Sequence, residues 1–321
     1  MYLKVGDLMD PITHAVVGVS LAVLAGEPLA LSNPVLIGTI IGAVIPDGDI
    51  VMQLKGHSSY LKNHRGVSHS VFAFPIYASL ITFALSIIFP DINFIRVFLF
   101  SIFGSLSHVV LDLANTYGAR VLWPIFKKRL TFNLLLVYDP VALISGLLII
   151  FPMTRQVISP FLVISLFSLY FLLRIIMKLI VIKSLGRNFE NEYKIDYIKV
   201  LPSMIGFLKW HFVIGAGEKK IIGEFNLFNK EMKVIEIMDN INTELFNIAI
   251  HTPTAQFFKD FTPLFHVNCE KKEEGYVFNF VDLRYYMAKD FVHNATTVLN
   301  DNFEVITSLF HPYNKTRNVE I

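Results

Sequence analysis

Apolar residues are concentrated in the first 182 positions of the chain, in runs that short polar segments separate. These runs cover residues 12–31, 34–46, 69–89, 94–114, 139–151 and 159–182. The third, fourth and sixth runs have the roughly 20 residues that an α-helix needs to cross a bilayer. The other three are marginal as spans, and 34–46 is predicted to be short, tilted or re-entrant.

The pattern changes after Lys183, where charges become frequent and apolar runs shrink to the length of strands. Three stretches are rich in β-branched and aromatic residues and predict strands: 212–217, 231–238 and 275–287. Residues 239–250 begin with Asp and Asn and have apolar spacing that predicts a short helix. The sequence therefore predicts a membrane-embedded helical domain over 1–182 and a soluble α+β domain over 183–321.

Composition supports this division. The chain is 54% hydrophobic and 17% charged, against about 45–50% and about 25% in ordinary soluble domains. A net charge of +2 argues against nucleic-acid binding, which needs a clustered basic excess. The single Cys269 excludes a disulfide framework and a four-cysteine zinc site. The expected fold class is a mainly α, polytopic membrane bundle of about six helices with a C-terminal α+β domain.

Basic residues near the ends of the apolar runs predict the orientation in the membrane. One side carries most of them: Lys55, Lys62, Arg65, Arg120, Lys127, Lys128, Arg129, Lys183 and Arg187. The other side has only Arg96 and Arg155. Asp10, Pro11 and His14 interrupt what would be the apolar core of a signal peptide. We expect a multi-pass protein of the inner (cytoplasmic) membrane with its N-terminus and its C-terminal domain in the cytoplasm.

Histidine and aspartate interrupt the membrane half in four clusters, each at an end of an apolar run that is predicted to be cytoplasmic. The clusters are Asp10/His14, Asp47/Asp49, His64/His69 and His108/Asp112, and Asp139 is a fifth candidate at the start of another run. Ionisable residues at membrane depth are energetically costly, so they are functional candidates by default. Because all four clusters fall on one side, we expect them to meet in one pocket.

The spacing of these residues indicates a metal site. Asp10/His14 and His108/Asp112 are i,i+4 pairs, so each pair shares one face of a helix. Imidazole and carboxylate together suit Zn²⁺ or Mn²⁺ better than Ca²⁺. The predicted ligands are His14, Asp47, Asp49, His64, His69, His108 and Asp112, and the predicted catalytic residues are Asp10 and Asp49. Seven ligands exceed the need of one catalytic zinc, which predicts two ions with a water nucleophile between them.

Structural roles are the alternative for several of these residues. Asp10 could simply cap its helix, and His69 could bond a neighbouring carbonyl group. Arg65 could clamp an anionic substrate or contact lipid headgroups instead. Asp282 and Arg284 could reach the site, although a surface ion pair on a strand is the simpler interpretation. The remaining histidines show no ligand spacing: His57, His211, His251, His266, His293 and His311.

Four sequence segments resemble a known family: Met9–His14, Pro46–Asp49, His64–Ser70 and Ser107–Asp112 followed by Asn115–Gly118. Together they are similar to the YdjM-like family of membrane-bound metal-dependent hydrolases, which has a LexA-associated member. The resemblance covers about residues 9–150, and the family usually has Thr where Ser68 stands. It implies a metal site and a hydrolase, with Arg65 and Asn115 as candidate substrate-binding residues. The His108-x-x-x-Asp112 spacing is also similar to a motif of zinc-dependent phospholipase C enzymes.

Three functions remain open from the sequence. The first is a metal-dependent hydrolase that acts on a phosphoester or lipid-linked substrate at the cytoplasmic face. The second is a transporter of divalent cations or protons, which predicts polar residues throughout the membrane depth. The third is a scaffold without enzymatic activity, in which a metal only holds helices together. Membrane lipid is the expected partner, and a protein partner could bind the C-terminal domain.

Overall fold

A computed structural model describes residues 5–56, 60, 64–151, 158–203, 206–273, 275–287, 290–312 and 318–320. The side chains of residues 5–10 and of Lys55 and Met287 lie outside this description. The chain divides into two compact units, one within residues 1–51 and 63–174 and the other within 52–62 and 175–321. Each unit is described by itself below.

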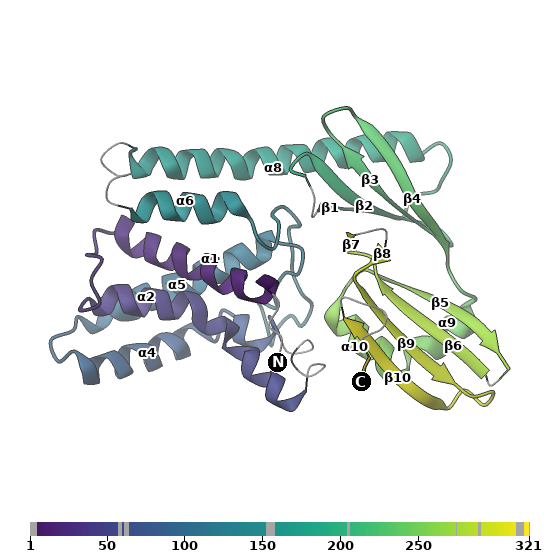
Figure 1. Ribbon diagram of the computed structural model, residues 1–321, viewed down its shortest axis with the longest axis horizontal. Helices are drawn as coiled ribbons and strands as arrows, with labels where there is room; N and C mark the ends of the chain where they lie inside the picture. Colours follow the sequence, from purple (N-terminus) through teal and green to yellow (C-terminus); the bar gives the residue numbers. More distant parts are fainter. Residues whose placement is uncertain are drawn as a thin grey trace. The chain divides into compact units, whose positions relative to one another are not determined.

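The first unit is helical (Figure 1). Its elements in chain order are α1 (Val5–Leu24), α2 (Pro34–Val44), the 3₁₀ helices η1 (Ile45–Lys55) and η2 (Val67–His69), α4 (Phe74–Ile88), α5 (Phe94–Ala114), α6 (Pro140–Ile150) and the first half of α8 (Pro160–Phe189). Asn33, Asn93 and Asp139 cap the starts of α2, α5 and α6 with their side chains. These caps explain why the helices begin where the apolar runs begin.

Small residues let the central helices approach closely. A Cβ atom added at Gly42 in α2 would clash with the backbone of Ser101 in α5, and one at Gly104 would clash with the backbone of Thr39 and Ala43. Ser105 also donates a hydrogen bond across this interface to the Gly42 carbonyl, at 3.0 Å. Close backbone approach through small residues is typical of helix pairs in membranes. This contact fixes the end of α2 beside the end of α5.

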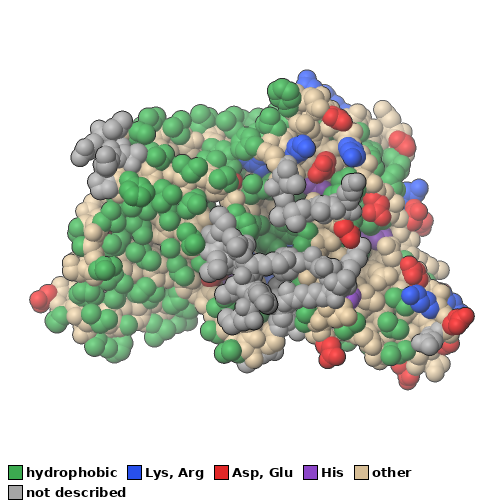
Figure 2. Space-filling view, in the orientation of Figure 1, with side chains coloured by type: hydrophobic (Ala, Val, Ile, Leu, Met, Phe, Trp, Pro, Cys, Tyr) green, Lys and Arg blue, Asp and Glu red, His purple; other side chains and the backbone are tan. Residues whose placement is uncertain are grey.

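The helical surface is strongly apolar. Exposed side chains include Leu80, Phe83, Ile87 and Ile88 on α4, Phe94 and Ile95 on α5, and Phe161 and Leu166 on α8. Figure 2 shows that hydrophobic side chains cover most of the visible face over these helices. A soluble protein rarely leaves so large an apolar surface in water, so this surface fits contact with lipid.

Three helical stretches of the described residues are long and apolar enough to cross a membrane: Pro34–Leu54, Phe94–Ala114 and Pro160–Phe189. The segments expected at 94–114 and 159–182 are therefore good candidates, whereas the one expected at 69–89 is a shorter helix. It begins only at Phe74, because His69 and Ser70 lie in and directly after η2, before α4 begins. Conversely, 34–46 is prolonged by η1 and reaches spanning length. Six crossings stay a prediction.

The second unit is built on β-sheets, as the C-terminal sequence predicted. The end of α8 packs on an antiparallel sheet of four strands in the order β1 (Tyr197–Pro202), β2 (Lys209–Ala216), β3 (Lys219–Asn226), β4 (Glu231–Asp239). Their core contains Leu185 and Phe189 from α8 with Trp210, Phe212 and Ile221 from the sheet. Because α8 runs unbroken from Pro160 to Phe189, it passes the predicted domain boundary at 182 without a linker.

A second sheet has the order β11 (Val319–Glu320), β10 (Val305–Pro312), β9 (His293–Leu299), β6 (Gly275–Asp282), β5 (Phe265–Lys272). The helices α9 (Thr243–Ile250) and α10 (Pro253–Phe261) precede it, and β7 (Tyr286–Met287) pairs with β8 (Asp290–Phe291). The strands predicted at 212–217, 231–238 and 275–287 correspond to β2, β4 and β6–β7. The predicted helix is α9, capped by Asn242.

Buried polar residues in the second unit have structural partners. Arg284 and Asp282 form an ion pair at 2.8 Å with exposed fractions of 3% and 0%, so the expectation of a surface pair is wrong. His211 lies within 2.9 Å of the Leu283 carbonyl oxygen, and burial lowers its pKa to about 4. Because His211 is neutral and buried, it is a core residue of the sheet.

The α2–α5 contact leads to a first prediction. In Gly42→Ala, the new methyl group must push α2 away from Ser101, and overpacking of this kind costs about 1–3 kcal/mol. We expect a lower midpoint of thermal unfolding in detergent.

Gly48→Ala is the matched control in the same polypeptide stretch, because a Cβ atom at Gly48 meets nothing within 4 Å. Equal loss of stability in the two variants would show that the close approach of α2 and α5 is not what holds the bundle.

Candidate metal centre

Four separate pieces of the first unit deliver histidine and aspartate to one place. His14 comes from α1, and Asp47 and Asp49 come from η1, directly after α2. His69 comes from η2, and His108 and Asp112 come from the last turns of α5. His14, His69, His108 and Asp112 are at most 1% exposed. The expectation that these clusters meet in one pocket therefore agrees with the geometry.

The orientation of His108 follows from one hydrogen bond. Its Nδ1 lies 2.7 Å from the carbonyl oxygen of Ala43, which can only accept. Nδ1 therefore carries a proton, and when the ring is neutral Nε2 presents a lone pair. The Ala43 carbonyl belongs to the last turn of α2, so the close α2–α5 contact sets this tautomer.

A second chain of hydrogen bonds orients His69. The Asp49 carboxylate accepts from the Ser68 hydroxyl at 2.9 Å, and the hydroxyl oxygen lies 2.9 Å from Nδ1 of His69. Since the single hydroxyl proton goes to the carboxylate, Nδ1 of His69 is the donor to Ser68. In the neutral ring, Nε2 of His69 then also presents a lone pair. It lies 3.0 Å from Nε2 of His108.

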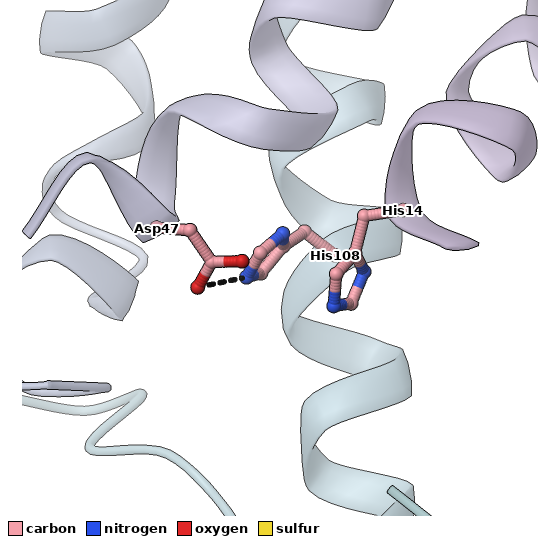
Figure 3. A group of neighbouring side chains, drawn as sticks. All are labelled: His14, Asp47 and His108. Atoms are coloured by element: carbon pink, nitrogen blue, oxygen red, sulfur yellow. Dashed lines mark ion pairs between the residues drawn. The ribbon is translucent and has the colours of Figure 1, made fainter. Parts of the chain in front are cut away.

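Two carboxylate oxygens complete the group. Asp47 Oδ1 lies 3.5 Å from Nε2 of both His69 and His108, and Asp112 Oδ2 lies 3.1 Å and 3.5 Å from them. Both oxygens are buried and accept no hydrogen bond from the described residues. Figure 3 shows Asp47 pointing toward the His108 ring, with the His14 ring beside it. Four electron-rich atoms thus face one another away from water.

These separations have the size of a coordination shell. Ligand atoms about 2.0–2.1 Å from a tetrahedral zinc ion lie about 3.3 Å from one another. The two histidine nitrogens lie 3.0 Å apart, and the four separations between these nitrogens and the carboxylate oxygens range from 3.1 to 3.5 Å. The donor set of two imidazoles and two carboxylates also suits Zn²⁺ or Mn²⁺. The side chains therefore fit a bound divalent metal ion.

Charge supports the same conclusion. The described cluster contains three carboxylates and one guanidinium group, which leaves −2 when the histidines are neutral. Arg65 lies 3.1 Å from Asp112 Oδ1 and donates to Asn115 Oδ1 at 2.9 Å, and Asn115 donates to Asp112 Oδ1 at 3.3 Å. These contacts hold one oxygen of Asp112 and leave the other toward the histidines. One divalent cation balances the remaining charge.

His64 and Asp49 lie at the accessible edge of the group. His64 Nδ1 is 2.8 Å from Asp49 Oδ1, and the His64 side chain is 25% exposed. Asp49 also accepts from the Arg65 backbone at 3.0 Å. The conformation of Arg65, with φ of 56°, is sparsely populated for a residue other than glycine. The chain thus turns sharply here, so His64 and Arg65 contact different carboxylates.

The predicted site residues divide into those that lie together in the structure and those that do not. Three groups of possible ligands lie within 4.8 Å: His14/Asp47/His108, His69/His108/Asp112 and Asp47/Asp49/His64. Every predicted ligand is in one of them, although their roles as ligands stay predictions. The Asp10 side chain lies outside the described residues. Asp139 caps α6 and accepts from the Tyr170 hydroxyl at 2.6 Å, so its contacts are structural.

Arg65 and Asn115, predicted to bind substrate, are 2% and 3% exposed and contact Asp112, so the structure brings them to the candidate metal ligands. Sequence analysis did not find the supporting roles of Ser68, the Ala43 carbonyl group and Arg129. Arg129 donates to the His64 carbonyl oxygen at 2.7 Å. Ser68 lies between the candidate ligands His64 and His69 in the sequence. This position was the signal that could have indicated its supporting role.

Fold and site define a class of protein: a helical membrane protein with a buried histidine–aspartate group able to hold a metal ion. The chain belongs to the YdjM inner membrane protein family, whose model matches residues 9–181. The YfhP C-terminal alpha/beta plait domain matches residues 244–319. The chain is 28% identical to the Bacillus subtilis (strain 168) "uncharacterized protein YfhP", over 86% of this chain and 87% of that protein. No solved structure matches.

Ser68 provides a second prediction. In Ser68→Ala, Nδ1 of His69 and Asp49 lose the hydroxyl that joins them, so the His69 ring is no longer held in its ligand tautomer. Loss of such an outer contact typically weakens metal binding by about 10–100-fold. Titration of the metal-free protein with Zn²⁺ and Mn²⁺ in a calorimeter measures the change.

Ser68→Thr keeps the hydroxyl and should bind as the unchanged protein does. Ser79→Ala removes an exposed hydroxyl of α4 that donates only to the Pro75 carbonyl, and it is the matched control. Unchanged metal affinity in Ser68→Ala would show that the Asp49–Ser68–His69 hydrogen bonds do not orient His69 for metal binding.

Proposed function

We propose that this protein is a metal-dependent hydrolase of the membrane that cleaves a phosphoester, with a lipid or lipid-linked molecule as its substrate. One observation carries the proposal: the lone pairs of His69 and His108 and the oxygens of Asp47 and Asp112 converge in a buried site. Like charges and lone pairs repel at 3.0–3.5 Å, and a divalent cation between them removes the repulsion.

When bound, one or two Zn²⁺ or Mn²⁺ ions supply an activated water and clamp the oxygens of the phosphoester. Asp47 and Asp112, with His69 and His108, would hold the first ion. His64 and Asp47 would take part in a second position at the edge, because they lie with Asp49 within 4.8 Å. The Asp49 carboxylate lies 2.8 Å from Nδ1 of His64, so it would hold this ring with Nε2 free to face the second position.

The accessible side of the site supports an anionic substrate. Asp47 and His64 are the partly exposed members of the group, at 12% and 25%, so a substrate would approach from their side. Arg129 contacts the His64 backbone there, and Lys127 and Lys128 precede it in the sequence. Positive charge at the entrance attracts phosphate groups and raises their local concentration.

The proposed location is the cytoplasmic face of the inner membrane. The family is one of inner membrane proteins, and three helical stretches have spanning length and composition. The basic residues of the loops support a cytoplasmic position for the site and the C-terminal domain, by the positive-inside rule. A site at the ends of α2 and α5 would then lie near the headgroups, where the phosphoesters of lipids are found.

The rival functions make different demands on the same residues. A cation transporter needs polar groups along the whole membrane depth, whereas the His and Asp residues of the described helices gather at one end. A scaffold needs the metal but no access for a substrate, whereas His64 is partly exposed. Both observations support the hydrolase.

The third prediction concerns metal and activity together. Asp112→Asn removes a charge that contacts His69 and His108, and His108→Gln removes a candidate ligand. Both variants should lose most of their bound metal, measured by mass spectrometry of the purified protein. Both should also lose hydrolysis of bis(p-nitrophenyl) phosphate, and a chelator should abolish it in the unchanged protein.

His251→Gln is the matched control, because His251 is exposed in the second unit and bonds only the backbone of its own helix. It should keep both metal and activity. Bound metal without hydrolysis of any phosphoester or lipid in a panel would favour the scaffold. Metal-dependent ion flux into vesicles would favour the transporter, and either result would overturn the proposal.

A further inference from the structure

The segment between α5 and α6 has exposed apolar side chains beside the basic residues that lie near the candidate metal centre. Three of its apolar side chains are exposed: Leu122, Ile125 and Phe126, at 43%, 80% and 39%. Three basic residues follow directly: Lys127, Lys128 and Arg129. No acidic residue stands between Asp112 and Asp139 in the sequence, and the side chains of Lys127 and Lys128 are exposed.

This segment is fixed rather than loose. Its ends pair with each other through the bridge between Ala119 and Leu130. Its first half is bonded to the stretch that carries His69: the Val121 carbonyl accepts from Val71 N at 3.0 Å, and the Trp123 carbonyl accepts from the Ser70 hydroxyl. The exposed apolar and basic side chains are therefore displayed on a rigid backbone.

Two further hydrogen bonds join the segment to the turn that carries His64 and Arg65. Arg120 N donates to the Arg65 carbonyl at 3.1 Å, and Arg129 donates to the His64 carbonyl at 2.7 Å. The segment thus braces both residues of the sharp turn that carries His64. A surface partner that holds the segment would also hold this edge of the site.

The position in the chain restricts what this surface meets. The candidate span Phe94–Ala114 ends just before the segment, at the end that carries His108 and Asp112, and the apolar helix α6 begins after it at Pro140. A segment at that place emerges at the headgroup level. Apolar side chains beside clustered lysines are the combination that binds an anionic lipid surface, with each Lys contributing about 1 kcal/mol.

We infer that residues 119–132 form a docking element for an anionic lipid surface, in which Leu122, Ile125 and Phe126 enter the acyl boundary and Lys127 and Lys128 bind lipid phosphates. Charge complementarity selects this partner over a neutral membrane. The inference rests on the membrane location and not on hydrolysis, so it can fail or succeed separately from the proposed activity.

The chain holds its own probe for this contact. Trp123 lies in the segment, and the other tryptophan, Trp210, is buried in the second unit. The full chain with Trp210→Phe is reconstituted into phosphatidylcholine vesicles that contain brominated phosphatidylglycerol or, separately, the same fraction of brominated phosphatidylcholine. We expect the acyl-chain bromines to quench Trp123 in both, and the anionic lipid to quench it several-fold more strongly. The converse variant, Trp123→Phe, should show little quenching.

Charge removal tests the specificity, as the fourth prediction. The double variant Lys127→Gln with Lys128→Gln should remove the stronger quenching by phosphatidylglycerol, because each lysine contributes up to about fivefold to the affinity for anionic lipid. A salt concentration of 1 M should remove it in the unchanged protein as well. Lys271→Gln with Lys272→Gln removes the same charge from an exposed hairpin and should leave the preference intact. Equal quenching by the two headgroups in the unchanged protein would overturn the inference. So would iodide quenching of Trp123 in vesicles without quenching by bromolipid.

Discussion

The structure depends on holding electron-rich atoms together where water cannot screen them. Nε2 of His69 and of His108, with one oxygen each of Asp47 and Asp112, lie 3.0–3.5 Å apart in the interior of the helical unit. Burying such groups without a partner costs several kcal/mol. A divalent cation that joins these atoms would remove this cost, and in the proposed hydrolase it would also supply the chemistry of the site.

Contacts elsewhere in the helical unit hold these four atoms in their relative positions. Gly42 and Gly104 bring α2 against α5, so the Ala43 carbonyl group can fix the His108 tautomer. Asp49 joins the Ser68 hydroxyl and the backbone of Arg65, so the turn that carries His64 and the ring of His69 are held by one carboxylate. The segment at residues 119–132 also contacts this turn, and it displays exposed apolar and basic side chains.

The sequence predicted the secondary structure and the candidate ligands better than the side-chain contacts between elements. The length of the apolar runs and the composition of the strands predicted the helical and β-sheet parts, and the i,i+4 spacing of His108 and Asp112 placed both on one helix face. The role of Ser68 and the contact between Arg65 and Asp112 were not predictable, because they depend on how η1, η2 and α5 meet. The span expected at 69–89 was too long for the same reason: His69 and Ser70 bond to the site and to the 119–132 segment, so α4 begins later.

X-ray absorption spectroscopy of the purified protein, at the edge of the metal found in it, tests the central claim most directly. A metal bound by the described group should show a first shell of nitrogen and oxygen at about 2.0–2.2 Å and the outer-shell scattering of two or more imidazole rings. A protein that carries no stoichiometric metal after purification in metal-containing buffer would contradict the account. A metal shell without imidazole scattering would do the same.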